Sequence, residues 1–375
     1  MARRTATAEI EVFPEVDRLD DFPHPRETAK LFGHRAAQSD LVQAFQSGRM
    51  HHGWIITGAD GIGKATLAYQ FATLALSPDG ERNWSPSSGF ALDRDSPTAR
   101  QVRQLSHPGL LVIRRGYDIK NKRFPTAISV EEVRRLRGFL SHKAADEAWR
   151  IVIVDRADEL NINAANALLK SLEEPPHRTA FLLLTVEPGR LLPTIRSSCR
   201  LLPLEPLNDT DVLAAAEQAL SHSDTEPNSE LAELVPMAAG SVRRLLTLTS
   251  GDGAEISRAI DNFLQTVSRH DWQISHALAE RLGPNTAQQS YEMFFVLLLE
   301  RLARIIRARA GGACHEIDKK LALQLIPDGA LATWVNLWET LQRDKSEIQA
   351  LNLDRTAFLL DALARIQSAT TTGRR

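Results

Sequence analysis

One glycine-rich segment has the composition and spacing of a loop that holds phosphate. Gly58, Gly61 and Gly63 lead into Lys64 in the run GADGIGKAT, between an apolar segment and a helical one. In such a loop the glycines let backbone N–H groups converge on phosphate oxygens, the start of the helix adds positive potential, and the lysine ammonium meets the β and γ phosphates. The spacing predicts a nucleotide-binding loop, and a plain glycine-rich turn is the alternative.

The loop lacks the hydroxyl that ordinarily follows its lysine and binds magnesium. Ala65 occupies that position, and Thr66 lies one residue further on, about 100° around a helix. The sequence therefore leaves ATP binding open and argues against magnesium. We assign no metal ligand. The site is therefore interpreted as vestigial. Its candidate nucleotide-binding residues are Gly58, Gly61, Gly63, Lys64, Thr66, Asp155 and Arg243.

A carboxylate after an apolar strand would supply the second half of the site. Asp155 follows the run 151–154, and open α/β sheets bind ligands at the carboxyl ends of their strands. In hydrolytic sites of this kind a glutamate comes next and polarises water, but here the residue is Arg156, and a cation is no general base. Asp158 and Glu159 are alternatives, although solvated carboxylates at the start of a helix are the favoured interpretation. We assign no catalytic residue.

Short apolar segments alternate with amphipathic ones over residues 28–205. This alternation predicts an α/β fold, a parallel sheet with helices on both faces. Expected strands cover residues 54–57, 110–113, 151–154, 181–184 and 200–204, and expected helices cover residues 64–76, about 129–140 and about 163–174. Residues 77–98, rich in Ser, Pro, Gly and Asp, and the basic segment 114–123 are expected to be flexible loops.

The second half of the chain has a different pattern. Beyond Pro206 the β-branched runs disappear, and Leu- and Ala-rich helical periodicity continues almost to the end. The predicted domains are a polar N-terminal tail (1–27), the α/β phosphate-loop domain (28–205), a small helical lid (206–251), an all-α C-terminal domain (252–367) and a flexible tail (368–375).

Composition excludes several classes of protein. With 375 residues, 43% hydrophobic and 25% charged, the chain has the composition of an ordinary globular protein of two or three domains. Its 45 basic and 47 acidic residues nearly cancel, so net charge does not indicate nucleic-acid binding. Cys199 and Cys314 are too few for a disulfide framework, which suits a reducing cytoplasm. No apolar run reaches the ~20 residues that a membrane span needs.

Several later segments resemble a known family. Residues 155–160 (DRADEL) and 166–176 (NALLKSLEEPP) are similar to bacterial replicative clamp loaders, the AAA+ assemblies of the DNA polymerase III holoenzyme. Residues 192–199 resemble the segment that carries the Ser-Arg-Cys motif, and residues 240–244 resemble the sensor 2 region of the lid. The likeness covers about residues 27–366. It implies an AAA+ P-loop domain, a helical lid and a C-terminal helical collar.

The departures from the family pattern imply a particular role. ATP-hydrolysing subunits of this family would carry a hydroxyl after the loop lysine, an acidic pair on the strand and four zinc-binding cysteines. This chain has Ala65, Arg156 and no cysteine in residues 77–98. The resemblance therefore implies a subunit without zinc and without activity of its own, within a nucleotidyltransferase holoenzyme. An active P-loop or AAA+ ATPase, or a small kinase that uses Lys64, is the alternative.

The resemblance also implies partners. Five subunits would be joined through their collars, with an ATPase subunit and the delta subunit as direct neighbours of this chain. The sliding clamp and primer-template DNA would be met through the complex, and no membrane is involved.

An arginine that the family uses across a subunit boundary is absent from its place. In the family pattern the arginine of Ser-Arg-Cys approaches the γ phosphate bound by the adjacent subunit. Here Ser198 stands there, with Arg196 and Arg200 two residues away on either side. Two residues turn a helix by about 200° but return to the same side of an extended strand. We predict that this trans-acting arginine, or arginine finger, is lost. Whether Arg196 or Arg200 takes over its role is left open.

Three further features have two interpretations each. The basic segment 114–123 is a DNA contact or a solvated charged hairpin, and we favour the hairpin. Arg243 either reaches a nucleotide or, with Arg244, is an exposed helix residue. Trp334 and Trp338, four residues apart, favour a helical core, with part of their stripe shared between subunits.

Overall fold

The computed structural model describes residues 14–19, 22–120, 123–141, 148–221, 231–249, 252–267, 272–284, 287–312, 314, 316–351 and 354–372. Contacts divide the chain into two compact units. The α/β unit runs to Pro236 and includes Gly240–Arg243, whereas the helical unit comprises Met237–Ala239 and the chain from Arg244 onward.

A five-stranded parallel sheet is the base of the α/β unit. Its strands are β1 (Gly53–Thr57), β4 (Leu110–Ile113), β5 (Arg150–Val154), β6 (Thr179–Thr185) and β7 (Arg200–Pro203), in the order β4-β5-β6-β1-β7. All five expected strands are confirmed. β6 is buried along its whole length and β5 at every residue after Arg150, which explains why their sequences show no polar alternation.

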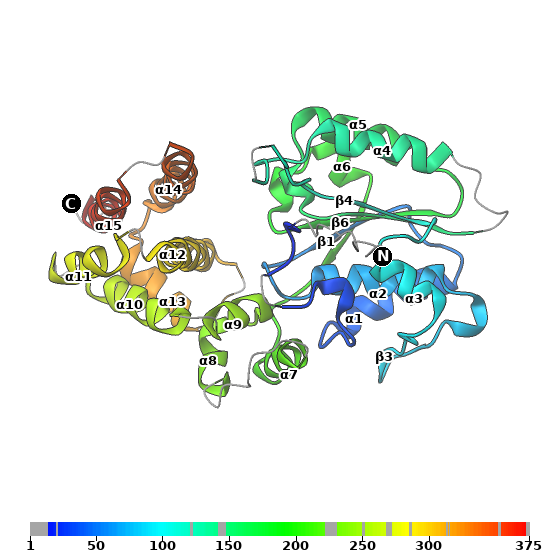
Figure 1. Cartoon of the computed structure of the whole chain (residues 1–375), viewed down its shortest axis with the longest axis horizontal. Helices are drawn as coiled ribbons and strands as arrows, with labels where there is room; N and C mark the ends of the chain where they lie inside the picture. The colour runs from blue at the N-terminus through cyan, green and yellow to red at the C-terminus, as the bar shows by residue number, and fades with distance from the viewer. Residues whose placement is uncertain are drawn as a thin grey trace, which may run out of the picture. The chain divides into compact units, whose positions relative to one another are not determined.

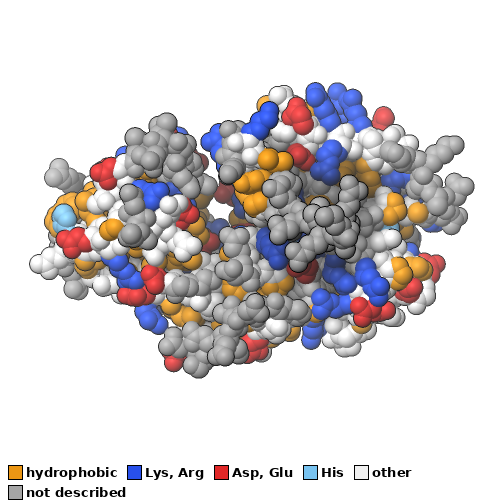
Figure 2. Space-filling model, viewed as in Figure 1, with side chains coloured by type: hydrophobic (Ala, Val, Ile, Leu, Met, Phe, Trp, Pro, Cys, Tyr) orange, Lys and Arg blue, Asp and Glu red, His pale blue; other side chains and the backbone are white. Residues whose placement is uncertain are grey.

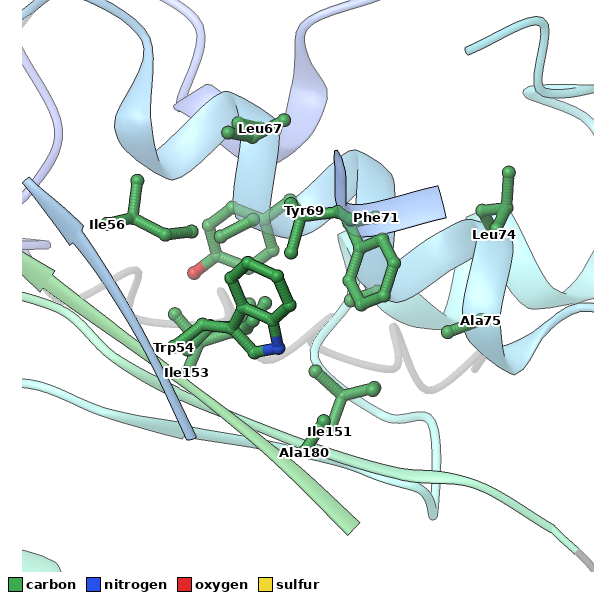
Figure 3. Packing of buried hydrophobic residues seen from close by; sticks show 14 of the residues in the cluster. Trp54, Ile56, Leu67, Tyr69, Phe71, Leu74, Ala75, Ile151, Ile153 and Ala180 are labelled. Carbon is green, nitrogen blue, oxygen red and sulfur yellow. The ribbon is translucent and has the colours of Figure 1, made fainter. Parts of the chain in front are cut away.

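Helices cover both faces of the sheet, as the sequence predicts (Figure 1). On one face lie α1 (Arg35–Gln46), α2 (Lys64–Leu76) and α3 (Pro97–Arg103), and on the other lie α4 (Val130–Ser141), α5 (Ile162–Glu173) and α6 (Pro193–Ser197). Strand residues alternate between the two cores: Ile153 packs on the α2 side and Val152 on the α5 side. Figure 3 shows Trp54, Tyr69 and Phe71 packed into the first of these cores.

Residues 77–98, predicted to be a flexible loop, contain short regular structure. A 3₁₀ turn (Asp79–Glu81) precedes a two-stranded antiparallel ladder of β2 (Trp84–Ser85) and β3 (Gly89–Phe90). Phe90 is buried in the α2 core, and its backbone N–H donates to Gln38 Oε1 at 3.3 Å. Trp84 and Leu92 also pack against this core, and the Arg82 guanidinium lies 5.0 Å from the centre of the Phe45 ring. These contacts hold a segment whose Ser- and Gly-rich composition predicted mobility.

Beyond β7, the regular elements of the described residues are all helices. They are α7 (Asp209–Leu220), α8 (Leu231–Ala238), α9 (Val242–Thr249), α10 (Gly253–Thr266), α11 (Trp272–Leu282), α12 (Gln288–Arg309), α13 (Glu316–Leu325), α14 (Leu331–Leu351) and α15 (Arg355–Thr372). In the helical unit α12 contacts α10, α13 and α14, and Phe295 of α12 stacks on Phe358 of α15 with ring centroids 4.9 Å apart. Among the described residues, no helix is both long and apolar enough to cross a membrane.

The divisions between the units differ from the predicted domains. Helix α7 and most of α8 belong with the sheet, and α9 belongs with the helical unit from Arg244 onward. Residues 368–372, predicted to be a flexible tail, continue α15, where Ala369 and Thr370 are buried. Residues 14–19 and 22–27, predicted to be a polar tail, are described below; residues 1–13 lie outside the described part of the chain.

An ionic cluster is buried among α9, α10, α12 and α13. Arg301 and Asp318 are only 3% and 4% exposed and form an ion pair, and Arg301 Nε lies 2.8 Å from Asp261 Oδ1. Arg304 Nη2 donates to Asp318 Oδ1 at 3.0 Å. Burial, with help from the neighbouring Arg244, lowers the pKa of Arg304 to about 9. We call the six residues Arg244, Asp261, Glu300, Arg301, Arg304 and Asp318 the helical-unit cluster.

The two tryptophans of α14 have different environments. Trp334 is fully buried, which confirms its predicted place in the core. Trp338 is partly buried, and its Nε1–H donates to the carbonyl oxygen of Leu299 at 2.9 Å.

Candidate functional site

The phosphate loop joins β1 to the start of α2, in the context that the sequence predicts. Gly63 is the N-cap of α2 with φ 106°, and Gly61 has φ 70°, so both occupy the region that favours glycine. A Cβ on Gly61 would lie 2.3 Å from the Cβ of Arg243, so the loop approaches this residue only because it has no side chain there. The backbone thus keeps the shape of an anion-binding turn at a helix N-terminus.

Lys64 points into its own loop. Its Nζ donates to the carbonyl oxygens of Gly58 and Ala59, at 3.0 and 2.7 Å, and the side chain is buried. Burial lowers the pKa of Lys64 below its usual value, although Asp60 and Asp155 act in the opposite direction. A phosphate would have to draw the ammonium away from these two carbonyls.

Asp155 is buried at the end of β5, where the sequence places it. Its pKa is raised to about 7, first by burial and then by the neighbouring Asp17 carboxylate. Burial also raises the pKa of Asp17, but His24 and Arg114 outweigh that effect and hold it well below its usual range. Of the two carboxyl groups, Asp155 is therefore the one whose protonated form is favoured.

The residues around the loop do not fit a magnesium ion. Ala65 brings no oxygen, and Thr66 is buried in α2. Burial and the neighbouring Asp17 raise the pKa of Asp155 to about 7, and a protonated carboxyl group does not suit a cation. Among the described residues, no group of three or more His, Cys, Asp or Glu could hold a metal ion.

The acids that follow Asp155 are held by Arg156. Arg156 Nη2 lies 3.1 Å from Asp158 Oδ2 and 3.3 Å from Glu159 Oε1, and Arg115 Nε lies 2.6 Å from Glu159 Oε2. The Asp158 side chain is fully buried, and Glu159 is 15% exposed. The expectation that these acids are solvated is wrong, because two arginines compensate them inside the fold. Neither carboxylate is available to polarise a water.

The adjacent arginines at the start of α9 belong to different units. The backbone N–H groups of Val242 and Arg243 donate to the carbonyl oxygen of Gly61, and Arg243 Nε lies 3.9 Å from Asp60 Oδ2. The structure therefore brings Arg243 to the phosphate loop. Arg244 is instead buried in the helical unit, where it pairs with Glu300 at 3.0 Å. Arg244 is thus not the exposed helix residue that one interpretation expected.

Sequence reasoning missed three residues of the site. Glu15, Asp17 and His24 fall in the predicted polar tail, yet Glu15 and Asp17 both pair with Arg114, and Asp17 reaches Asp155. The predicted tail is therefore wrong for residues 14–19 and 22–27. An acid in a polar segment looks the same whether it is solvated or meets an arginine 97 residues later, so no local pattern marks Asp17.

Part of the basic segment 114–123 is paired, although residues 121 and 122 lie outside the described residues. The choice between a DNA contact and a solvated hairpin stays a prediction. Asp118 and Arg123 form an antiparallel bridge, and Tyr117 packs edge-on against Phe124 with centroids 5.2 Å apart. Arg114 and Arg115 are not free cations, because Arg114 binds Glu15 and Asp17 and Arg115 binds Glu159.

The region predicted to carry the trans-acting arginine lies at α6 and β7. Ser198 caps α6 and its Oγ donates to the carbonyl oxygen of Thr194 at 2.8 Å. The Arg200 guanidinium lies over the Trp54 ring at 5.1 Å, and Arg196 is exposed on α6. Loss or relocation of the finger stays a prediction.

Figure 2 shows Lys and Arg side chains gathered over the part of the α/β unit where Figure 1 places α4 and α5. On α4 two of these cations are paired within the helix, Arg134 with Glu131 and Arg135 with Glu132. These two cations are therefore partly compensated within the helix.

Comparison with known sequences gives consistent matches. The family described as DNA polymerase III, delta subunit, matches residues 33–208. The chain is similar to the DNA polymerase III subunit delta′ of Escherichia coli, with 30% identity over 267 residues, covering 70% of this chain and 73% of that one. It is 32% identical over 192 residues to the delta′ subunit of Pseudomonas aeruginosa, covering 51% and 53% of the two chains.

A more distant relative and one solved structure extend these matches. The tau/gamma subunit of Haemophilus influenzae is 26% identical over 327 residues, covering 81% of this chain and 42% of that one. A gamma subunit-related protein of Thermotoga maritima superposes with a TM-score of 0.44 at 17% identity, over 89% and 99% of the two chains.

Proposed function

The chain belongs to the delta′ family of DNA polymerase III subunits, and from this premise we propose that it serves in a clamp loader as a subunit that does not hydrolyse ATP. It would assist the ATP-dependent loading of a sliding clamp on primer-template DNA. The chemistry of hydrolysis would belong to other subunits of the complex.

One observation carries the non-hydrolysing part of this proposal. The residue after Asp155 is Arg156, whose guanidinium holds both nearby acids, Asp158 and Glu159, in ion pairs. A general base must accept a proton from water, and a carboxylate buried in such a pair is not free to do so. Ala65 also removes the hydroxyl that would bind the metal of an ATP complex.

The partners follow from the family. We propose a hetero-pentamer in which this chain contacts ATPase subunits of the tau/gamma type and a delta subunit, and meets the clamp and DNA through the complex. Cys199 and Cys314 are both free thiols, in keeping with the reducing cytoplasm in which we place this assembly.

An ATPase assay of the purified chain tests the proposal. We expect no turnover above background, in the unmodified chain or in Lys64→Ala. Turnover at an ordinary enzymatic rate, about 1 s⁻¹ or more, that Lys64→Ala abolishes would establish an active ATPase instead. The same chain, mixed with a tau/gamma subunit, should elute with it on gel filtration, and separate elution would contradict the clamp-loader assignment.

A further inference from the structure

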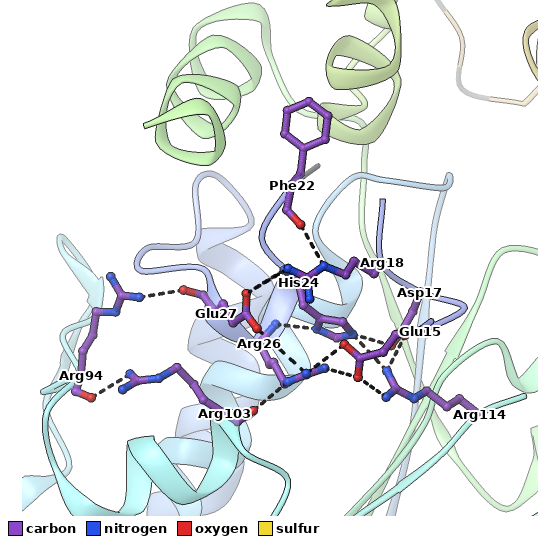
Figure 4. Close-up of polar contacts among 10 residues, drawn as sticks. All are labelled: Glu15, Asp17, Arg18, Phe22, His24, Arg26, Glu27, Arg94, Arg103 and Arg114. Atoms are coloured by element: carbon purple, nitrogen blue, oxygen red, sulfur yellow. Dashed lines mark hydrogen bonds and ion pairs between the residues drawn. The ribbon is translucent and has the colours of Figure 1, made fainter. Parts of the chain in front are cut away.

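The segment before the first helix is bound tightly to the α/β unit. We call residues 14–19 and 22–27 the N-terminal strap. Glu15 pairs with both guanidinium nitrogens of Arg26, at 2.8 and 2.9 Å, and also binds Arg114, which in turn binds Asp17 (Figure 4). These contacts are charge-assisted and partly buried, so the strap is an ordered part of this unit.

His24 positions Asp17 within the strap. The His24 ring is fully buried, and its Nδ1 accepts a hydrogen bond from the backbone N–H of Arg26 at 3.1 Å. The other ring nitrogen, Nε2, lies 2.9 Å from Asp17 Oδ2 and 3.1 Å from Arg114 Nη1. His24 and Arg114 thus hold the Asp17 carboxylate in one orientation.

Asp17 reaches two residues that the sequence assigned to the nucleotide. The Asp17 carboxylate is a close enough neighbour of Asp155, at the end of β5, to raise the pKa of that carboxyl group. Its carbonyl oxygen accepts a hydrogen bond from Arg243 Nη1 at 3.4 Å, and Arg243 Nε lies 3.9 Å from Asp60 of the phosphate loop. The strap therefore spans from the phosphate loop to Asp155, the interval that the terminal phosphates would occupy.

While the strap is docked, the carboxylates between the phosphate loop and Asp155 disfavour the binding of a polyphosphate. A nucleoside triphosphate would bring several negative charges beside Asp17 and Asp60, at a site where Lys64 already donates to loop carbonyls. If Asp17 leaves, one carboxylate is removed and Arg243 and Arg114 each lose an anionic or carbonyl partner. A phosphate group offers the same kind of acceptor to these cations that Asp17 now supplies.

We propose that the N-terminal strap is an internal competitor of nucleotide, in which Asp17 holds the phosphate end of the site until a nucleoside triphosphate displaces it. This inference rests on the proposed function only in taking the Lys64 loop as a nucleotide site. ATP hydrolysis by the chain would contradict the proposed function, whereas the inference is decided by binding affinity.

Titration calorimetry of ATP into the full chain tests the proposal. Asp17→Ala removes the competing carboxylate, and we expect it to bind ATP at least tenfold more tightly than the unmodified chain. Glu15→Ala loosens an anchor of the strap without touching Asp155 or Arg243, and a gain of several-fold is expected. Lys64→Ala, added to Asp17→Ala, should abolish the gain, because the new binding belongs to the phosphate loop.

Asp79→Ala is the matched control, since Asp79 is an exposed acid paired with a neighbouring arginine and should leave ATP affinity unchanged. Circular dichroism verifies that each variant is folded. Equal ATP affinity for the unmodified chain, Asp17→Ala and Glu15→Ala would overturn the proposal. So would the failure of folded Asp17→Ala and Glu15→Ala chains to bind ATP at all, because the strap would then have nothing to exclude.

Discussion

Two groups of buried charges, one in each unit, differ in the contacts they make. In the helical-unit cluster the close contacts join opposite charges: Arg301 and Arg304 with Asp318, and Arg244 with Glu300. Beside the phosphate loop, Asp17 binds cations on one side and neighbours the carboxyl group of Asp155 on the other. Opposite charges compensate each other inside the fold, whereas two adjoining acids need a proton or a ligand. The second arrangement is therefore the candidate functional site of the two.

The largest effect should come from breaking the helical-unit cluster. Asp318→Ala leaves Arg301 and Arg304 buried without their shared carboxylate, so the free energy of unfolding should fall by about 3–5 kcal/mol. Urea denaturation followed by circular dichroism measures it. Asp328→Ala, which removes a fully exposed partner of Arg309, should leave the midpoint unchanged. Equal shifts of the urea midpoint in the two variants would mean that burial of the cluster contributes nothing to the free energy of unfolding.

Removing the Asp155 carboxyl should change the pH dependence of stability. Because the pKa of Asp155 is raised from 3.8 to about 7, the folded chain keeps a proton that the unfolded chain loses, so Asp155 reduces stability as pH rises through this window. Asn cannot titrate. Asp155→Asn should therefore be more stable than the unmodified chain by about 4 kcal/mol near pH 8, with little difference at about pH 4.

Urea denaturation across this pH range measures the effect, with Asp40→Asn, an exposed acid on α1, as the control. The lowered pKa of Asp17 contributes only below about pH 4, outside the window. Parallel pH profiles for Asp155→Asn and the unmodified chain would show that the pKa of Asp155 is not raised in the folded chain.

The smallest expected effect is a difference in stability between alanine variants of two adjacent residues, Arg243 and Arg244. Arg244→Ala removes a buried guanidinium that binds Glu300 and the carbonyl oxygen of Met237, at a cost of about 2 kcal/mol in unfolding free energy. Arg243→Ala removes a side chain that is 34% exposed, and the cost should stay below about 1 kcal/mol. Thermal denaturation of the two variants gives the comparison, and the opposite ranking would contradict it.

Local patterns in the sequence predict much of this molecule. The apolar runs of β5 and β6 give both strands because a buried parallel strand leaves its mark on consecutive residues. The glycines before Lys64 predict the loop because only glycine tolerates that backbone. These features depend on residues a few positions apart, which is the distance over which a pattern is informative.

What the sequence did not predict depends on distant partners. The burial of Asp158 follows from Arg156 beside it, but whether that pair faces solvent depends on how the surrounding strands pack. The place of Asp17 depends on Arg114 and Asp155, which directly follow two separate strands of the sheet, β4 and β5. Arg243 and Arg244 carry the same side chain in adjacent positions, and only the tertiary structure assigns them to different units.

The strap also has a consequence for the order in which the protein acquires its shape. Synthesis proceeds from the N-terminus, so residues 14–19 leave the ribosome before the residues that they bind. Arg114 follows Asp17 by 97 residues, and Asp155 is made later still. The strap cannot dock before β4 and β5 exist. In every newly made molecule, the phosphate loop is therefore synthesised before the N-terminal strap can dock beside it.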